Sequence, residues 1–281
     1  DSKKKIYMHW MYDVPMGEQL DDDGDSLESI EGCLTDAQYN RDEHRKAVID
    51  DILDNWVSQS HNGKFHAILA TSSIPEAIKY YKLFAQRDCG LKTTAVFDPS
   101  DGNNESSIEK IDGIAQMLED YNSLFGTCFN ISGYASFKRD VCARLAHKTP
   151  YTAVENEPSK CLDILIVVDQ MLTGYDSKWL NTLYMDKFYK WSNIEMIIQA
   201  FSRTNRVFND DKPHGIIRYY RRPYTMKNII EYAFEQYSGQ KPYGIFVAKL
   251  IQNLENMNAA FSDINDIFKI AGIPDFFKTS R

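Results

Sequence analysis

The chain has 281 residues, a length typical of one large domain or of a domain with an appendage. Hydrophobic residues make up 43% of it, which is enough for a sizeable core. Its formal charge of −8 argues against a surface that binds DNA everywhere but leaves room for a local basic groove. The longest strongly apolar run, 164–168, is far too short to cross a bilayer, so we expect no membrane partner.

Cysteine and histidine usage argues against a metal centre. The five cysteines are scattered and contain no Cys-x-x-Cys pair, and the six histidines contain no His-x-x-x-His pair. We therefore expect neither a metal site nor a disulfide framework, and a reducing, cytoplasmic compartment fits best. The chain begins without Met and without a signal-peptide apolar region, so we expect it to be an internal piece of a longer protein.

The first part of the chain is predicted to be a linker followed by a leading helix, together spanning 1–58. Its acidic stretch predicts a solvated loop or linker. The acidic residues are Glu18, Asp21, Asp22, Asp23, Asp25, Glu28 and Glu31. A helix is predicted over 36–56 because apolar residues recur there with helical spacing. This stripe comprises Val48, Ile49, Ile52, Leu53 and Trp56.

Short apolar runs then alternate with helical patterns, which predicts an α/β domain over 59–222. Strands are expected at 65–70, 93–97, 162–168, 181–185 and 215–220, and helices at 75–86, 107–125, 136–147 and 194–202. The nearly continuous apolar run 162–168 is typical of a parallel strand covered on both faces. The alternation predicts a parallel sheet with helices on both faces. Helices at 228–237 and 246–261 predict a small helical C-terminal extension over 223–281.

The segment 199–206, Gln-Ala-Phe-Ser-Arg-Thr-Asn-Arg, has a pattern suited to phosphate chemistry. An ATP-driven motor needs a guanidinium that reaches the γ-phosphate from across a cleft. Arginine suits this role because it is always charged and presents a rigid donor fork. On a helix, Arg203 and Arg206 would share a face with Gln199. The structural alternative is a solvated helix face with two harmless arginines.

A second segment, 167–176, follows the best predicted strand directly. Ligands of α/β sheets bind at the carboxyl ends of the strands, where we expect this loop to lie. Thr173 and Gly174 offer a hydroxyl and an unhindered backbone, and Asp176 offers an acceptor for a ribose or for a partner arginine. The structural alternative is a loop that merely turns.

The two segments resemble motifs V and VI of superfamily 2 helicases and translocases. Motif VI there reads Gln-x-x-Gly-Arg-x-x-Arg, and this chain has Ser202 in place of the Gly. With that departure, 170–176 and 199–206 are similar to the motor (R) subunit of type I restriction-modification enzymes. The similarity covers most of the chain, through 39–44, 64–73, 97–99 and 144–148. It implies a second RecA-like motor domain followed by the start of a helical C-terminal domain.

Carried over by position, the resemblance implies a nucleotide site. Arg203 and Arg206 would be the catalytic, phosphate-sensing arginines. Gln199, Gly174 and Asp176 would line the nucleotide cleft.

The resemblance also implies contacts to nucleic acid. Thr71, Ser72 and Ser73 match the motif after the first strand, which touches the nucleic-acid backbone in this superfamily. Thr173 could face either ligand. A further hypothesis concerns late basic residues interleaved with tyrosines, which could grip a phosphate backbone or simply surround an exposed strand end. These residues are Arg218, Arg221, Arg222, Lys227, Tyr219, Tyr220 and Tyr224.

Several motifs of a complete motor are absent from the sequence. The nearest approach to a Walker A loop, 62–64, fails because Phe65 follows the lysine, and neither an Asp-Glu-x-His box nor a Glu-x-Lys nuclease motif occurs. The resemblance thus implies ATP and Mg²⁺ held mainly on a first motor domain outside this chain. The implied partners are double-stranded DNA and the methyltransferase and specificity subunits. Two alternatives are an assembly module for that methyltransferase core and half of another superfamily 2 helicase.

Overall fold

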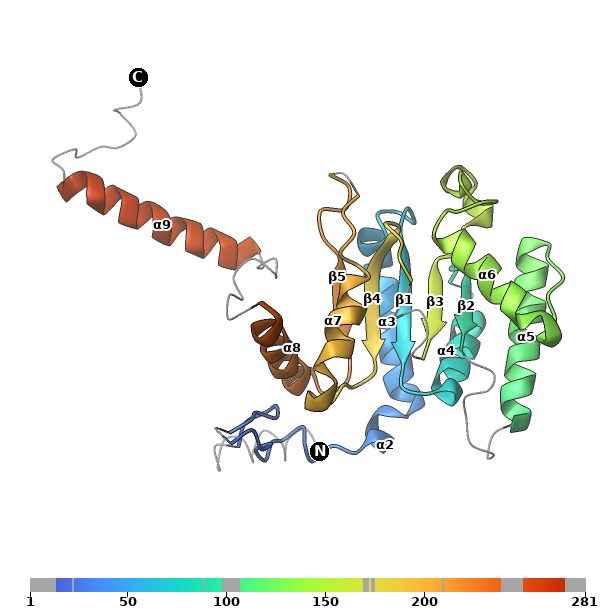
Figure 1. The fold of residues 1–281 in the computed structure, drawn as a ribbon, viewed down its shortest axis with the longest axis horizontal. Helices are drawn as coiled ribbons and strands as arrows, with labels where there is room; N and C mark the ends of the chain where they lie inside the picture. Colours follow the sequence, from blue (N-terminus) through green and yellow to red (C-terminus); the bar gives the residue numbers. More distant parts are fainter. Residues whose placement is uncertain are drawn as a thin grey trace, which may run out of the picture. The chain divides into compact units, whose positions relative to one another are not determined.

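The computed structural model describes residues 14–21, 23–87, 89–97, 107–168, 172, 175–208, 210–238 and 250–270. Its centre is a five-stranded sheet with the order β2-β3-β1-β4-β5, in which every neighbouring pair is parallel (Figure 1). The strands are β1 (His66–Thr71), β2 (Thr93–Val96), β3 (Ile164–Val167), β4 (Leu180–Asp186) and β5 (Ile216–Tyr219). The predicted strands are therefore confirmed.

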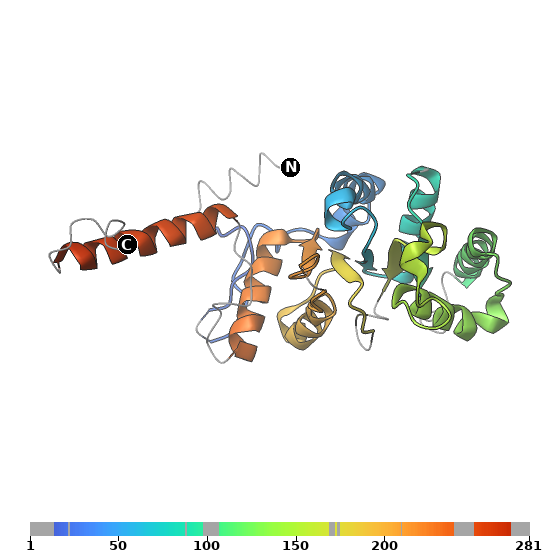
Figure 2. The ribbon, with the colours of Figure 1, turned by 90° about the horizontal axis from the view of Figure 1, so that it is seen from above.

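Helices surround this sheet. They are α2 (Asp36–Tyr39), α3 (Asp42–Gln59), α4 (Ile74–Arg87), α5 (Ser107–Phe125), α6 (Tyr134–Leu145), α7 (Ile194–Ser202) and α8 (Pro223–Ser238). Short 3-10 helices cover Ile131–Gly133, Val154–Asn156, Pro158–Lys160 and Trp191–Asn193. Seen from above, α3 and α4 cover one face of the sheet, and α7 lies on the other (Figure 2). This is the α/β architecture of a RecA-like domain, as predicted.

The core explains why the apolar runs are continuous. β1, β3 and β4 are buried along their whole length, because each is covered by helices on its faces and by strands on both sides. The predicted stripe of α3 is buried at Val48, Ile49, Ile52 and Trp56. The helix predicted over 36–56 is nevertheless two helices, because the backbone of Arg41 is extended between α2 and α3.

The acidic N-terminal stretch is only partly the solvated linker that we predicted. Asp21, Asp23 and Asp25 are exposed, and Asp22 lies outside the described residues. Glu31, however, is buried, and its carboxylate accepts hydrogen bonds from the backbone N–H groups of Tyr224 (3.1 Å) and Thr225 (2.7 Å) in the first turn of α8. A carboxylate there satisfies backbone donors that have no partner within the helix.

The compact unit extends beyond the predicted boundary between 222 and 223. Helix α8 buries Met226, Ile229 and Ile230 in the main core, so the compact unit runs to Tyr237 and a second unit begins at Ser238. The leading helix α3 likewise belongs to the first unit. The second unit contains α9 (Leu250–Ile270); residues 246–249 of the helix predicted there lie outside the described residues.

Within the described ranges, no helix combines the length and the apolar character that a bilayer span requires.

Candidate functional site

Asp176 lies at the amino edge of the sheet, near the end of the β3–β4 loop. The hydroxyl of Tyr175 is 3.1 Å from Nε2 of His66, the first residue of β1. Strands β3 and β4 are parallel and their connection contains no described helix, so the connecting loop itself returns the chain to the amino edge. Our expectation that Asp176 lies at the carboxyl edge is therefore wrong. Thr173 and Gly174 lie outside the described residues.

Asp176 and Arg206 form a two-pronged ion pair at this edge. Nε of Arg206 is 2.8 Å from Oδ1 of Asp176, and Nη2 is 3.1 Å from Oδ2. The side chain of Arg206 is 59% exposed, and that of Asp176 is 56% exposed. The structure thus brings together one residue from each of the two predicted segments, and Asp176 has a partner arginine. Parallel N–H···O bonds of this kind orient a guanidinium firmly, but solvent weakens their energetic contribution.

Arg203 lies beside this pair, but the two arginines do not share a helical face. Helix α7 ends at Ser202, so that Arg203 is its C-cap and Arg206 follows in irregular backbone. The guanidinium of Arg203 donates to the carbonyls of Gln199 (3.2 Å) and Tyr175 (3.2 Å). Gln199 is exposed on the last turn of α7. The shared-face prediction is therefore wrong, although all three residues lie at the same end of α7.

The helix ends where it does because of packing. Thr204 is buried, and its hydroxyl donates to the carbonyl of Phe201 at 3.0 Å. Gly215, just before β5, passes so close that a Cβ there would lie 2.3 Å from Oγ1 of Thr204. This close approach holds the segment after α7 against the start of β5, and it leaves no room for a side chain at position 215.

One residue of this site carries no sequence signal. Lys212 is buried next to the backbone of Arg206. Its amine donates to the carbonyls of Arg206 (2.7 Å) and Lys178 (3.2 Å). In the sequence it is one lysine in a polar turn, and no spacing or motif marks it. Burial lowers the pKa of Lys212 to about 8.

Three of the residues predicted to contact nucleic acid, Thr71, Ser72 and Ser73, lie at the opposite, carboxyl edge, whereas Thr173 lies outside the described residues. Thr71 is fully buried, and its hydroxyl donates to the carbonyls of Val167 (3.1 Å) and Ser73 (3.3 Å). The side chain of Thr71 thus links β1 to β3, and its contact to nucleic acid stays a prediction. The hydroxyl of Ser73 accepts from the backbone N–H of Glu76 at 3.4 Å, in the first turn of α4. Ser72 alone of the three is exposed.

A buried ionic network also lies at the carboxyl edge and was not predicted. Asp186, the last residue of β4, accepts hydrogen bonds from His44 (2.7 Å) and Tyr80 (3.0 Å). The guanidinium of Arg221 donates to both of its carboxylate oxygens, at 2.9 and 3.0 Å. Burial opposes the charge of Asp186, but the bonds from His44 and Arg221 outweigh it and hold the pKa of Asp186 below its usual 3.8.

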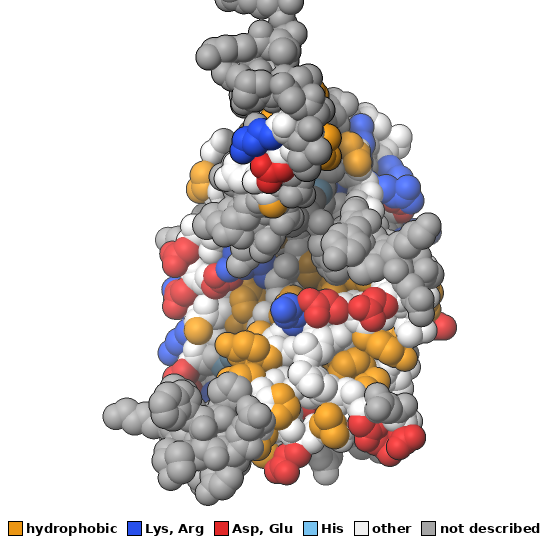
Figure 3. All heavy atoms as spheres, turned by 90° about the vertical axis from the view of Figure 1, so that its left-hand side faces the viewer, with side chains coloured by type: hydrophobic (Ala, Val, Ile, Leu, Met, Phe, Trp, Pro, Cys, Tyr) orange, Lys and Arg blue, Asp and Glu red, His pale blue; other side chains and the backbone are white. Residues whose placement is uncertain are grey.

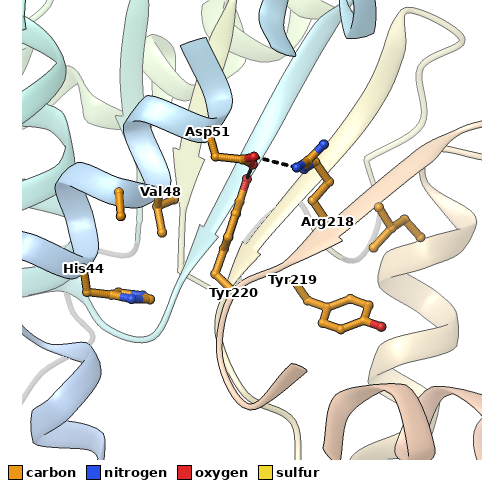
Figure 4. A pocket seen from close by; sticks show the side chains of 8 residues that line it. His44, Val48, Asp51, Arg218, Tyr219 and Tyr220 are labelled. Atoms are coloured by element: carbon orange, nitrogen blue, oxygen red, sulfur yellow. Dashed lines mark hydrogen bonds and ion pairs between the residues drawn. The ribbon is translucent and has the colours of Figure 1, made fainter. Parts of the chain in front are cut away.

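The late basic residues are engaged within the domain. Asp51 of α3 accepts from Arg218 (2.5 Å) and Tyr220 (2.8 Å) along a groove between α3 and β5 (Figure 4). Arg221 is buried and forms an ion pair with Asp186, and Arg222 forms an ion pair with Glu18 at 3.3 Å. In the space-filling view of Figure 3, basic and acidic side chains are interspersed with hydrophobic ones. The structure therefore favours the structural alternative over a phosphate-binding cluster for these arginines.

In the part of the chain that the structure describes, no group of three or more His, Cys, Asp or Glu side chains is arranged to hold a metal ion.

Comparisons with known proteins identify the family. Residues 63–222, more than half of the chain, match the family model described as type I restriction enzyme subunit R domain 3. The SsaAORF53P endonuclease subunit of Staphylococcus saprophyticus is 32% identical over 71% of the chain and 21% of its own length. The SauMRSORF196P endonuclease subunit of Staphylococcus aureus MRSA252 is 31% identical over 68% of the chain and 20% of its own length.

A shorter match has higher identity. The HindI endonuclease subunit of Haemophilus influenzae is 42% identical over 21% of the chain and 5% of its own length. The chain spans about a fifth of the length of the two staphylococcal relatives. The family match contains all five strands together with Asp176, Arg203 and Arg206. The chain therefore belongs to the R-subunit family of type I restriction enzymes, and within that family it contains domain 3.

Proposed function

We propose that this chain is the second motor lobe of an ATP-dependent translocase that moves along double-stranded DNA and drives its cleavage. In this proposal it supplies Arg203 and Arg206 to ATP bound on a first lobe of the same R subunit. The observation that carries the proposal is the Asp176–Arg206 pair, an oriented guanidinium that is 59% exposed at one edge of the sheet.

The exposure of the pair suits a residue that changes partners. An exposed ion pair contributes little to stability, so Arg206 can leave Asp176 at little cost when a phosphate approaches. Until then Asp176 holds the donor fork in one orientation, which reduces the entropy lost on binding phosphate. Arg203 is held from behind by two backbone carbonyls, and Gln199 is exposed beside it.

The remaining parts of the reaction would come from elsewhere in the subunit. Bound Mg²⁺ and the first lobe's phosphate loop would neutralise charge on the transferred γ-phosphate. This chain's share is one wall of the cleft: Gln199 and Asp176 border it, and the two arginines stabilise the charge that develops in the transition state.

DNA would be contacted at the opposite edge. Ser72 is exposed two residues before α4 begins, and the backbone N–H groups in the first turn of a helix favour phosphate. Separate edges for nucleotide and DNA allow closure of the two lobes on ATP to shift the DNA contact at the other edge. Contacts of this kind are independent of base sequence, which a translocase requires.

An assembly role is a second candidate, favoured by one observation. Helix α9 has large apolar side chains that are exposed within its own unit: Met257, Phe261, Ile264 and Ile267. Their spacing follows one side of a helix, which is typical of a surface that packs against another protein or domain. In this proposal α9 helps to dock the R subunit on the methyltransferase core.

The test uses the full-length R subunit reconstituted with its methyltransferase and specificity subunits. ATP turnover, DNA cleavage and DNA methylation are measured in parallel for Arg203→Ala and Arg206→Ala. We expect turnover and cleavage to fall together while methylation persists, because only the motor is affected. For the alternative, a subunit ending at Tyr237 is tested for binding to the methyltransferase core; unchanged binding would eliminate the assembly role of the C-terminal unit.

A further inference from the structure

Lys212 connects the two segments that form the Asp176–Arg206 pair. It is 1% exposed, and its ammonium donates to the carbonyl of Arg206 (2.7 Å) on one side and to that of Lys178 (3.2 Å) on the other. Lys178 belongs to the β3–β4 loop, two residues after Asp176. One buried amine therefore fixes the distance between the backbone that carries Arg206 and the loop that carries Asp176.

The backbone of Lys212 is itself anchored. Its N–H donates to the carbonyl of Phe208 at 3.1 Å, and its carbonyl accepts from the N–H of Phe208 at 3.0 Å. The ring of Phe208 packs against the rings of Trp179 and of Phe65, which lies just before β1. The distances between ring centroids are 4.6 Å and 5.5 Å, respectively. These contacts attach the turn that contains Lys212 to the amino edge of the sheet. The amine of Lys212 therefore has a defined position.

A buried lysine is an unusual choice for a purely structural contact. An ammonium has three donors and no acceptor, and burying it without a carboxylate is unfavourable. Both acceptors that the described residues provide for Lys212 are backbone carbonyls. Apolar side chains of similar volume often replace buried ionic groups with little change in stability, apart from the cost of leaving the two carbonyls without this donor. What the apolar side chain cannot do is hold two carbonyls from different segments at a set separation.

The ion pair cannot perform this task by itself. Both of its side chains are more than half exposed, and exposed pairs are weak and screened by salt. When Arg206 moves from Asp176 to a phosphate, the pair is broken altogether. The hydrogen bonds of Lys212 are made to backbone, so they persist while the side chain of Arg206 changes partner.

We propose that Lys212 is a positioning residue for Arg206: it holds the backbone of Arg206 against the β3–β4 loop, so that only the arginine side chain moves between Asp176 and the γ-phosphate. The inference rests on the proposed function. Lys212 does not touch the nucleotide; it acts through Arg206.

The test compares Lys212→Met and Lys212→Gln in the full-length R subunit, each alone and combined with Arg206→Ala. Methionine keeps the volume and removes the donor, and glutamine keeps a donor without charge. We expect Lys212→Met to lower kcat for ATP by about tenfold to a hundredfold, the scale of a small misplacement of a catalytic group. KM for ATP should change little, and Lys212→Gln should recover part of kcat. The matched control is Lys46→Met, since Lys46 is exposed on α3.

The double variants separate positioning from general damage. If Lys212 acts through Arg206, Lys212→Met lowers turnover no further, within about twofold, once Arg206 is alanine. An equal loss in both backgrounds, or wild-type kcat in both Lys212 variants, would overturn the inference. If Lys212→Met does not fold, judged by its melting temperature, the same cycle is run with Lys212→Gln. Wild-type turnover of Arg206→Ala alone would instead refute the proposed function.

Discussion

Replacing Arg206 by alanine separates its structural contribution from its catalytic one, because the structure predicts very different magnitudes for the two. Among the described residues, the side-chain hydrogen bonds of Arg206 are those to Asp176, in a pair whose side chains are both more than half exposed. A pair of this kind contributes about 0.2–1 kcal/mol to stability. The backbone of Arg206 remains held through its carbonyl by Lys212. The melting temperature of Arg206→Ala should therefore stay within a few degrees of wild type.

The catalytic effect should be much larger. Loss of an arginine that stabilises the γ-phosphate lowers turnover by roughly a thousandfold or more, which corresponds to about 4 kcal/mol in activation free energy. Arg206→Lys should recover little, because a lysine offers a point charge in place of a planar fork. The assay is DNA-stimulated ATP turnover by the reconstituted enzyme, together with thermal denaturation of the R subunit.

A matched control is available on the same domain. Arg139 is exposed on α6 and donates to Ser136 of the same helix, so Arg139→Ala removes the same charge without removing a contact of Asp176 or Arg206. We expect it to leave turnover unchanged. Turnover by Arg206→Ala equal to that of Arg139→Ala would show that the arginine assignment, or its register within 199–206, is wrong.

Three further predictions concern the chain and its internal contacts. The purified chain alone should neither hydrolyse ATP nor cleave DNA, because its sequence lacks a Walker A loop; sustained turnover by a pure preparation would contradict the half-motor proposal. Asp186→Asn should lower the free energy of unfolding by about 3 kcal/mol at pH 7, because it leaves Arg221 buried without its anion. Since the pKa of Asp186 is lowered on folding, its stabilising effect is full above the unfolded value of 3.8 and is lost as the pH falls through the folded value. Urea titrations at pH 7 and pH 3 should therefore show a difference from wild type that shrinks at the lower pH, and a constant difference would count against the pair. Arg144→Met should cost about 2–3 kcal/mol in the same titration at pH 7, because it leaves the buried hydroxyl of Tyr121 and the carbonyl of Lys160 without their donor; an unchanged midpoint would refute this.

Strands and helices were predictable because their information is local. A strand covered on both faces must be apolar at every position, so the run 162–168 predicts β3 without knowledge of its neighbours. The stripe from Val48 to Trp56 predicts the buried face of α3 in the same way. The motif strings are local too, and they indicated that Asp176 and Arg206 belong to one site before any contact between them was known.

Predictions failed or missed contacts where a residue's environment comes from distant parts of the chain. Glu31 appeared to belong to a solvated acidic stretch, yet it caps α8, whose first turn is 194 positions away. Thr71 appeared available to a ligand, yet it bonds the carbonyl of Val167, which is 96 positions away. The prediction that the two arginines share a helical face was wrong because α7 ends at Ser202. Just beyond that end, Gly215 brings the start of β5 against Thr204.

The sequence alone thus determined the fold class, the family resemblance and the residues that meet at the amino edge, since each depends on periodicity or on a short string. Only the tertiary structure decided at which edge of the sheet Asp176 and Arg206 meet, and that Lys212 lies buried beneath them. The physical reason is that the position of a side chain depends on the order of the strands in the sheet and on the path of the loops between them. Neither leaves a pattern in the residues nearby: a lysine in a polar turn looks the same in the sequence whether its amine faces water or two buried carbonyls.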